Sequence, residues 1–285
     1  MIQSMTGFGK SILQLPSKKI TVEIKSLNSK NMDLNARIPS QYREKELQLR
    51  NRISRELTRG KVDFSVFVEV SGEETTAAVN PAVVRKYMDQ LRSIVPGDDT
   101  ELLKMAVRMP DALKTEREEI NEEEFKAIEK AVIEALKEIN DFRSAEGKAL
   151  EDELFQRAKN IQDLLSRVMS MDPERIASVR ERLHKGVAEL KEEVDENRFE
   201  QELVYYIEKF DITEEKVRLE NHMNYFLETL NSTDSNGKKL AFISQEMGRE
   251  INTIGSKSNY APMQQLVVQM KDELEKIKEQ LLNVL

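Results

Sequence analysis

The spacing of apolar residues changes once along this chain, and no other feature of the sequence limits the possible folds as strongly. In the first 70 residues apolar and polar side chains alternate, as in the run ITVEIK at 20–25, which is typical of strands with one buried face. From Met109 onward Leu, Ile, Val and Met recur every third or fourth residue among charged ones, which is the spacing of amphipathic helices. The change predicts an α+β fold, with a β-rich N-terminal part and a mainly helical remainder.

The N-terminal part is expected to form a sheet covered by one helix. Alternating runs lie on both sides of Pro16-Ser17 and again at 31–38, and a helical stretch then begins near Pro39 and ends at Gly60. The run at 61–70 alternates once more. The order β-β-β-α-β in so short a segment predicts a sheet with the helix on one face. The small polar residues of 71–81 are expected to form a linker or loop.

The charged segments that follow predict long helices. We expect a domain boundary near residue 110, with an N-terminal α+β domain at 1–110 and a helical domain at 111–285. Residues 140–195 are predicted to form antiparallel, coiled-coil arms that extend beyond the body. Residues 200–285 are predicted to form C-terminal helices that return to the body.

Charge is distributed unevenly along the chain. The formal net charge is −8, yet residues 1–70 hold 13 Lys or Arg and 7 Asp or Glu, a balance of +6, so the other 215 residues carry −14. A basic part can hold a polyanion while an acidic part places carboxylates near it. Acidic helices can also serve solubility alone, and charge by itself does not separate the two interpretations.

The residue types that are missing exclude several chemistries. Without cysteine there is no thiolate nucleophile or thiolate metal site, so any metal must bind oxygen or imidazole, and only His184 and His222 supply imidazole. No segment approaches the roughly 20 apolar residues of a membrane span, and the N-terminus lacks the charged-then-apolar order of a signal peptide. We therefore expect a cytoplasmic protein that has no membrane partner.

Two C-terminal segments place polar side chains beside an apolar stripe. Spacings of three and four residues put four side chains of the first segment on one strip of a helix: Asp211, Glu215, Arg218 and His222. In the second segment one flank holds Glu246, Glu250, Thr253 and Lys257, and the other holds Gln245, Arg249, Asn252 and Ser256.

The carboxylates of the second segment allow two interpretations. Glu246 and Glu250 are one helical turn apart, and two carboxylates so spaced can jointly bind a hard divalent cation. The alternative is a ladder of Arg and Glu that only stabilises contacts between helices.

Six segments in order resemble the YicC-like family of bacterial endoribonucleases. They are MTGFG at 5–9, EIKSLNSKNMDLNARIP at 23–39, RGKV at 59–62, EGKAL at 146–150, DITEEKVRLENH at 211–222 and FISQEMGREINTIGSKS at 242–258. The resemblance spans nearly the whole chain. It implies a metal-dependent, cytoplasmic endoribonuclease that assembles into a ring-like homo-oligomer, a hexamer, around RNA, with the N-terminal domain in RNA binding and oligomerisation.

The resemblance also marks site residues, to which we assign roles. Glu215, His222, Glu246 and Glu250 are the candidate catalytic groups and the candidate ligands of a divalent manganese or magnesium ion. The candidate RNA and phosphate contacts are Lys25, Asn28, Arg37, Arg59, Arg218, Arg249, Asn252 and Lys257. Position 25 is often Arg in the family, and the lysine here binds phosphate as a point charge, so its contact is expected to be weaker.

Two chemistries could cut a single-stranded or loop RNA at such a site. The 2′-hydroxyl can attack its neighbouring phosphate with His222 and a carboxylate as acid and base, or a metal-bound water can attack. The abundance of carboxylates beside a single well-placed histidine favours the metal route. The alternatives to an enzyme are an RNA-binding adaptor that presents RNA to another nuclease without cutting it, and a helical scaffold whose polar ladders join subunits.

Overall fold

The computed structural model describes residues 2–16, 18–70, 78–114, 122–189, 195–232 and 236–285. Its N-terminal elements are strands β1 (Gly7–Gln14), β2 (Lys18–Leu27) and β3 (Met32–Arg37), a 3-10 helix η1 (Ser40–Lys45), helix α1 (Glu46–Leu57) and strand β4 (Gly60–Val70). This is the predicted β-β-β-α-β order. Most of the predicted linker, residues 71–77, lies outside the described residues.

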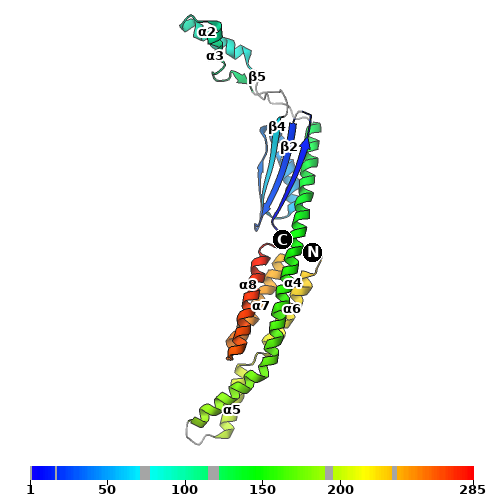
Figure 1. Ribbon diagram of the computed structural model, residues 1–285, viewed down its shortest axis with the longest axis vertical. Helices are drawn as coiled ribbons and strands as arrows, with labels where there is room; N and C mark the ends of the chain where they lie inside the picture. The colour runs from blue at the N-terminus through cyan, green and yellow to red at the C-terminus, as the bar shows by residue number, and fades with distance from the viewer. Residues whose placement is uncertain (1, 17, 71–77, 115–121, 190–194, 233–235) are drawn as a thin grey trace.

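The sheet has the strand order β1-β2-β4-β3, and only the β3–β4 pair is parallel. The alternating residues expected to face a core, Ile20, Val22 and Ile24, are fully buried with Phe64 of β4. Helices α1 and α4 (Glu122–Glu189) cover that face (Figure 1). Several residues that point to the opposite face are exposed, among them Phe8, Lys25 and Phe67, so much of that face remains open.

Two glycines allow the backbone of the N-terminal segment to pack directly against the backbone of α4. A Cβ on Gly9 of β1 would lie 2.0 Å from the Ala135 carbonyl oxygen, and a Cβ on Gly147 of α4 would lie 2.2 Å from that of Ile2. Between them, Thr6 donates a hydrogen bond to Glu146 at 2.7 Å. The segments MTGFG and EGKAL therefore form one structural joint.

A small separate module follows β4 in sequence. It pairs strands β5 (Ala78–Val79) and β6 (Leu113–Lys114) and packs helix α2 (Pro81–Ile94) on helix α3 (Asp99–Ala106). Asn80 caps α2 by accepting a hydrogen bond from the Val83 N–H, and Pro81 occupies the first turn, as the Asn-Pro pair predicts.

Helix α4 belongs to both halves of the protein, which differs from the predicted boundary near residue 110. Its residues from Phe125 to Ile139 complete the core under the sheet. Its residues from Leu154 to Val168 form the second core with α6 (Thr213–Leu230), α7 (Gly237–Lys257) and α8 (Ala261–Leu281). Figure 1 shows α4 running from the sheet past these three helices.

The arm is consequently shorter than the predicted 140–195. The part that continues beyond the second core is the end of α4 together with α5 (Glu196–Lys209) (Figure 1). The spacing of apolar residues correctly predicted a helix in this region, but it could not predict which other helices pack against its apolar face. At the base of the arm, Asp172 binds Arg175 at 2.8 Å and Lys216 of α6 at 2.5 Å, and Arg175 donates to the Phe210 carbonyl.

Candidate active site

Helices α6 and α7 carry all four predicted catalytic side chains, Glu215 and His222 on α6 and Glu246 and Glu250 on α7. The two helices pack on each other through apolar stripes. The members predicted from spacing are all buried: Ile212, Leu219, Met223, Phe226 and Leu230 for α6, and Leu240, Ile243, Met247, Ile251 and Ile254 for α7.

An ion pair sets the register of these helices. Lys257 Nζ, in the last turn of α7, lies 2.7 Å from Glu215 Oε1, in the first turn of α6, so the helices are antiparallel. His222 follows Glu215 by seven residues, and Glu250 precedes Lys257 by seven. Residues seven apart share a helix face, about 10.5 Å further along the axis. In this register His222 and Glu250 are each seven residues from the ion pair and are expected at about the same level, and among the described residues no hydrogen bond or ion pair joins them.

We call the line formed by Glu215, His222, Glu246, Glu250 and Lys257 the α6–α7 seam. Glu215 is 6% and Glu250 9% exposed, and the other three are half-buried. Within the described ranges, Glu215 Oε2 has no hydrogen-bond partner, and no contact fixes the side chains of His222 or Glu250. A carboxylate and an imidazole on neighbouring helices are side-chain types that can serve in proton transfer.

The two predicted flanks of α7 have different environments. Glu246, Glu250, Thr253 and Lys257 are buried or half-buried along α6, whereas the other flank is exposed to solvent: Gln245, Arg249, Asn252 and Ser256. Asn252 is therefore not part of the seam.

The predicted arginine contacts lie at the outer edge of the seam. Arg249 pairs with Glu246 at 3.0 Å and Arg218 pairs with Glu214, and both guanidinium groups are more than half exposed. The expectation that Asp211 and Arg218 share one strip with Glu215 and His222 is correct in spacing only. Asp211 lies before α6 and accepts hydrogen bonds from the Thr213 N–H and hydroxyl, and Arg218 points outward.

The structure does not bring the four candidate metal ligands into one cluster. In the described part of the chain, no three Asp, Glu or His side chains converge on a point that could hold an ion. Glu215 is paired with Lys257 and Glu246 with Arg249, whereas Glu250 makes no ion pair among the described residues. Magnesium keeps several waters and needs only one or two carboxylates beside substrate phosphates. The donor set thus fits a hydrated ion and not one enclosed by protein ligands.

The predicted RNA contacts of the N-terminal domain divide into two groups. Lys25 and Arg37 lie on the open face of the sheet, where Lys25 is bound to Glu23 at 3.3 Å. Lys10 and Lys25 together lower the pKa of Glu23, chiefly through the hydrogen bond from Lys10. Asn28 and Arg59 instead donate to the carbonyl oxygens of Leu282 and Val284, at 2.6 and 2.8 Å, so they hold the C-terminal tail against the sheet.

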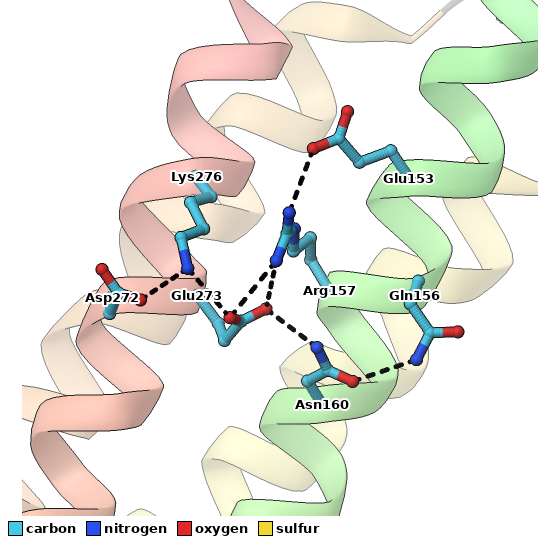
Figure 2. A network of polar contacts seen from close by, with 7 residues as sticks. All are labelled: Glu153, Gln156, Arg157, Asn160, Asp272, Glu273 and Lys276. Atoms are coloured by element: carbon cyan, nitrogen blue, oxygen red, sulfur yellow. Dashed lines mark hydrogen bonds and ion pairs between the residues drawn. The ribbon is translucent and has the colours of Figure 1, made fainter.

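A second polar cluster, between α4 and α8, was not identified from the sequence (Figure 2). Glu273 accepts hydrogen bonds from Arg157, Asn160 and Lys276. Burial raises the pKa of Glu273, but these donors together lower it below its usual range. Both Glu273 oxygens are bound, which indicates a structural link between the helices and contrasts with the unpartnered oxygen of Glu215.

Arg143 of α4 was also missed. It is 1% exposed and donates to the carbonyl oxygens of Met5 and Leu57 and to Ser26. No carboxylate pairs with it among the described residues, and burial lowers the pKa of its guanidinium. Arg143 joins the segments MTGFG and EIKSLN with the end of α1. Nothing in the spacing around position 143 distinguishes it from an exposed helix arginine.

Comparisons with known proteins identify the family to which the chain is similar. Residues 2–152 match the N-terminal region, and residues 168–285 the C-terminal region, of the "Endoribonuclease YicC-like" family. The "Probable endoribonuclease YicC" of Clostridioides difficile (strain 630) is 34% identical over 293 residues that cover all of both chains. The protein of the same name from Haemophilus influenzae is 29% identical over 291 residues, again covering all of both chains.

Proposed function

The chain belongs to the YicC-like endoribonuclease family, which supports an RNA-cleaving function, and from that premise we propose that it cuts unpaired RNA at the α6–α7 seam. The observation that supports the proposal is the Glu215–Lys257 ion pair, because in the register that it sets, His222 and Glu250 are each seven residues from the pair on neighbouring helices. Both side chains are sheltered, and neither is fixed by another contact in the described residues.

Each seam residue has a role in this proposal. Glu250 orients the His222 imidazole, which accepts a proton from the attacking hydroxyl and returns one to the leaving oxygen. Lys257, held by Glu215 two helical turns along the seam from Glu250, provides a positive charge for a neighbouring phosphate of the bound strand. A hydrated magnesium or manganese ion held by Glu246 and Glu250 would supply further neutralisation of the phosphate charge.

The proposal extends to RNA capture and assembly. Arg37 and neighbouring cations on the open sheet face attract the RNA backbone. Strands β1 and β3 are the edges of the sheet and could pair or pack between copies. We propose a ring-like homohexamer in which the sheets make the main contacts. None of the helices in the described ranges combines the length and apolar character needed to cross a membrane.

Cleavage of a 5′-labelled stem-loop RNA by the purified protein, with and without EDTA, tests the proposal. Cuts confined to the loop are expected, and loss of cutting in EDTA would support the metal. The product ends separate the two chemistries, because attack by the 2′-hydroxyl leaves a 2′,3′-cyclic phosphate and a 5′-hydroxyl. Binding without cutting, with and without added manganese, would instead indicate the adaptor. Light scattering on the same sample tests the hexamer.

A further inference from the structure

Two exposed aromatic rings lie at the end of the seam nearest the sheet. Tyr225 of α6 is 45% exposed and Phe242 of α7 is 64% exposed. Lys239 Nζ lies 4.6 Å from the centre of the Tyr225 ring, and Phe242 follows Lys239 by three residues, so all three side chains lie on adjoining surface. We call them the aromatic step.

The aromatic step is one helical turn from the catalytic groups. Tyr225 follows His222 by three residues on α6, and Phe242 precedes Glu246 by four on α7, and such spacings make neighbours on a helix surface. An RNA strand that runs from a phosphate at His222 toward the sheet would lay its next nucleotides over this surface.

The step also lies close to the predicted contacts of the N-terminal domain. Arg59 donates to the Val284 carbonyl, and the Leu285 carbonyl accepts from the Gly237 N–H at the start of α7. Lys239 is only two residues beyond Gly237. The C-terminal tail therefore connects Arg59 to the aromatic step, and the step lies between the sheet and the seam.

We propose that Tyr225 and Phe242 stack on unpaired bases next to the cut, while Lys239 binds the intervening phosphate. The inference rests on the proposed function and explains why the protein would prefer unpaired RNA as its substrate. Stacking on an aromatic side chain needs a free base face, which a duplex does not offer, and each stacked base contributes substantially to affinity whatever its sequence. Exposed Lys238 and Arg249 on the same helix complement the charge of the strand.

The test compares a double variant with a matched control. Tyr225→Leu/Phe242→Leu keeps apolar side chains and good helix formers but removes both rings. Phe142→Leu/Tyr205→Leu makes the same changes at exposed positions of α4 and α5, away from the seam. Binding of a fluorescent unstructured RNA and of a duplex RNA is measured by anisotropy in EDTA, so that no RNA is cut.

The double variant at the step should bind unstructured RNA at least tenfold more weakly than wild type, with duplex binding changed less than twofold and the control unchanged. Equal affinity for unstructured RNA, or an equal loss in the control, would overturn the inference. So would a changed oligomeric state in light scattering, which would identify the rings as a contact between copies.

The result of this binding test can be distinguished from the result of the cleavage test of the proposed function. If the wild-type protein cuts no RNA but the variant loses its preference for unstructured RNA, the proposed function fails, and the inference stands only for the stacking of unpaired bases on the two rings. If the wild type cuts RNA and the variant keeps full affinity, the inference fails alone.

Discussion

Replacing Gly147 by alanine should weaken the joint between the N-terminal segment and α4. The added Cβ would lie 2.2 Å from the Ile2 carbonyl oxygen and 2.8 Å from Gln3 Cα, whereas ordinary contact begins at 3.4 Å. The two backbones must separate by about 1.2 Å, the difference between 3.4 and 2.2 Å. Separation strains the 3.0 Å hydrogen bond from the Ser4 N–H to the Arg143 carbonyl and the packing of buried Ile2.

The expected cost follows from three terms. Overpacking a close contact costs about 1–3 kcal/mol, and a weakened hydrogen bond adds about 1 kcal/mol. Alanine in a helix recovers about 1 kcal/mol relative to glycine. The free energy of unfolding should therefore fall by about 1–3 kcal/mol, measured as a lower urea midpoint followed by circular dichroism.

Gly186→Ala is the matched control in the same helix. Nothing lies within 4 Å of a Cβ at Gly186, so the midpoint should stay the same or rise slightly. Equal midpoints for Gly147→Ala and wild type would refute the close approach, and with it the interpretation of MTGFG and EGKAL as one joint.

Two further predictions concern charge. Burial raises the pKa of Asp172, but hydrogen bonds from Lys216 and Arg175 lower it overall, so its contribution to stability is present above the unfolded pKa of about 3.9 and is lost as pH falls through the lower folded pKa. Asp172→Asn should therefore lower the free energy of unfolding by about 3 kcal/mol at pH 7, because Arg175 stays buried without its partner. In urea unfolding, the difference between variant and wild type should shrink below about pH 4. A difference that stays constant with pH would contradict this prediction. RNA affinity should fall steeply as the salt concentration rises. Arg37→Glu should weaken binding similarly for all RNA sequences and lower the slope of log affinity against log salt by about 1, whereas Arg180→Glu on the arm should change neither the affinity nor the slope. An RNA affinity that does not depend on salt would show that the sheet is not the RNA-binding surface.

The sequence predicted what depends on neighbours along one element. Alternation identified the strands, and three-to-four spacing identified the buried stripes of α6 and α7 and placed Glu246 and Glu250 on one flank of α7. These properties follow from the geometry of a single helix or strand, so they need no knowledge of the partner.

Contacts between distant elements could not be predicted in this way. The pairing of Glu215 with Lys257 depends on the register of two helices, and Arg59 reaches a carbonyl 225 residues away. The same limit explains the arm, because residues 154–168 have the charged and apolar spacing of a solvated arm but are covered by α6, α7 and α8. The spacing of apolar residues along a helix shows that one face is apolar, but it does not show which other elements pack against that face.

The rate of RNA cleavage by Glu250→Gln tests the central claim most directly. The swap keeps size and helix propensity but removes the charge that orients His222 and binds a cation, so cleavage of the loop RNA should fall at least 100-fold, with RNA binding and circular dichroism unchanged. Glu246→Gln should also lose most activity, and excess manganese should partly restore it. Glu228→Gln, at an exposed position of α6, should cut at the wild-type rate. Wild-type cleavage by folded Glu250→Gln would contradict the account and leave the α6–α7 seam as a contact between helices.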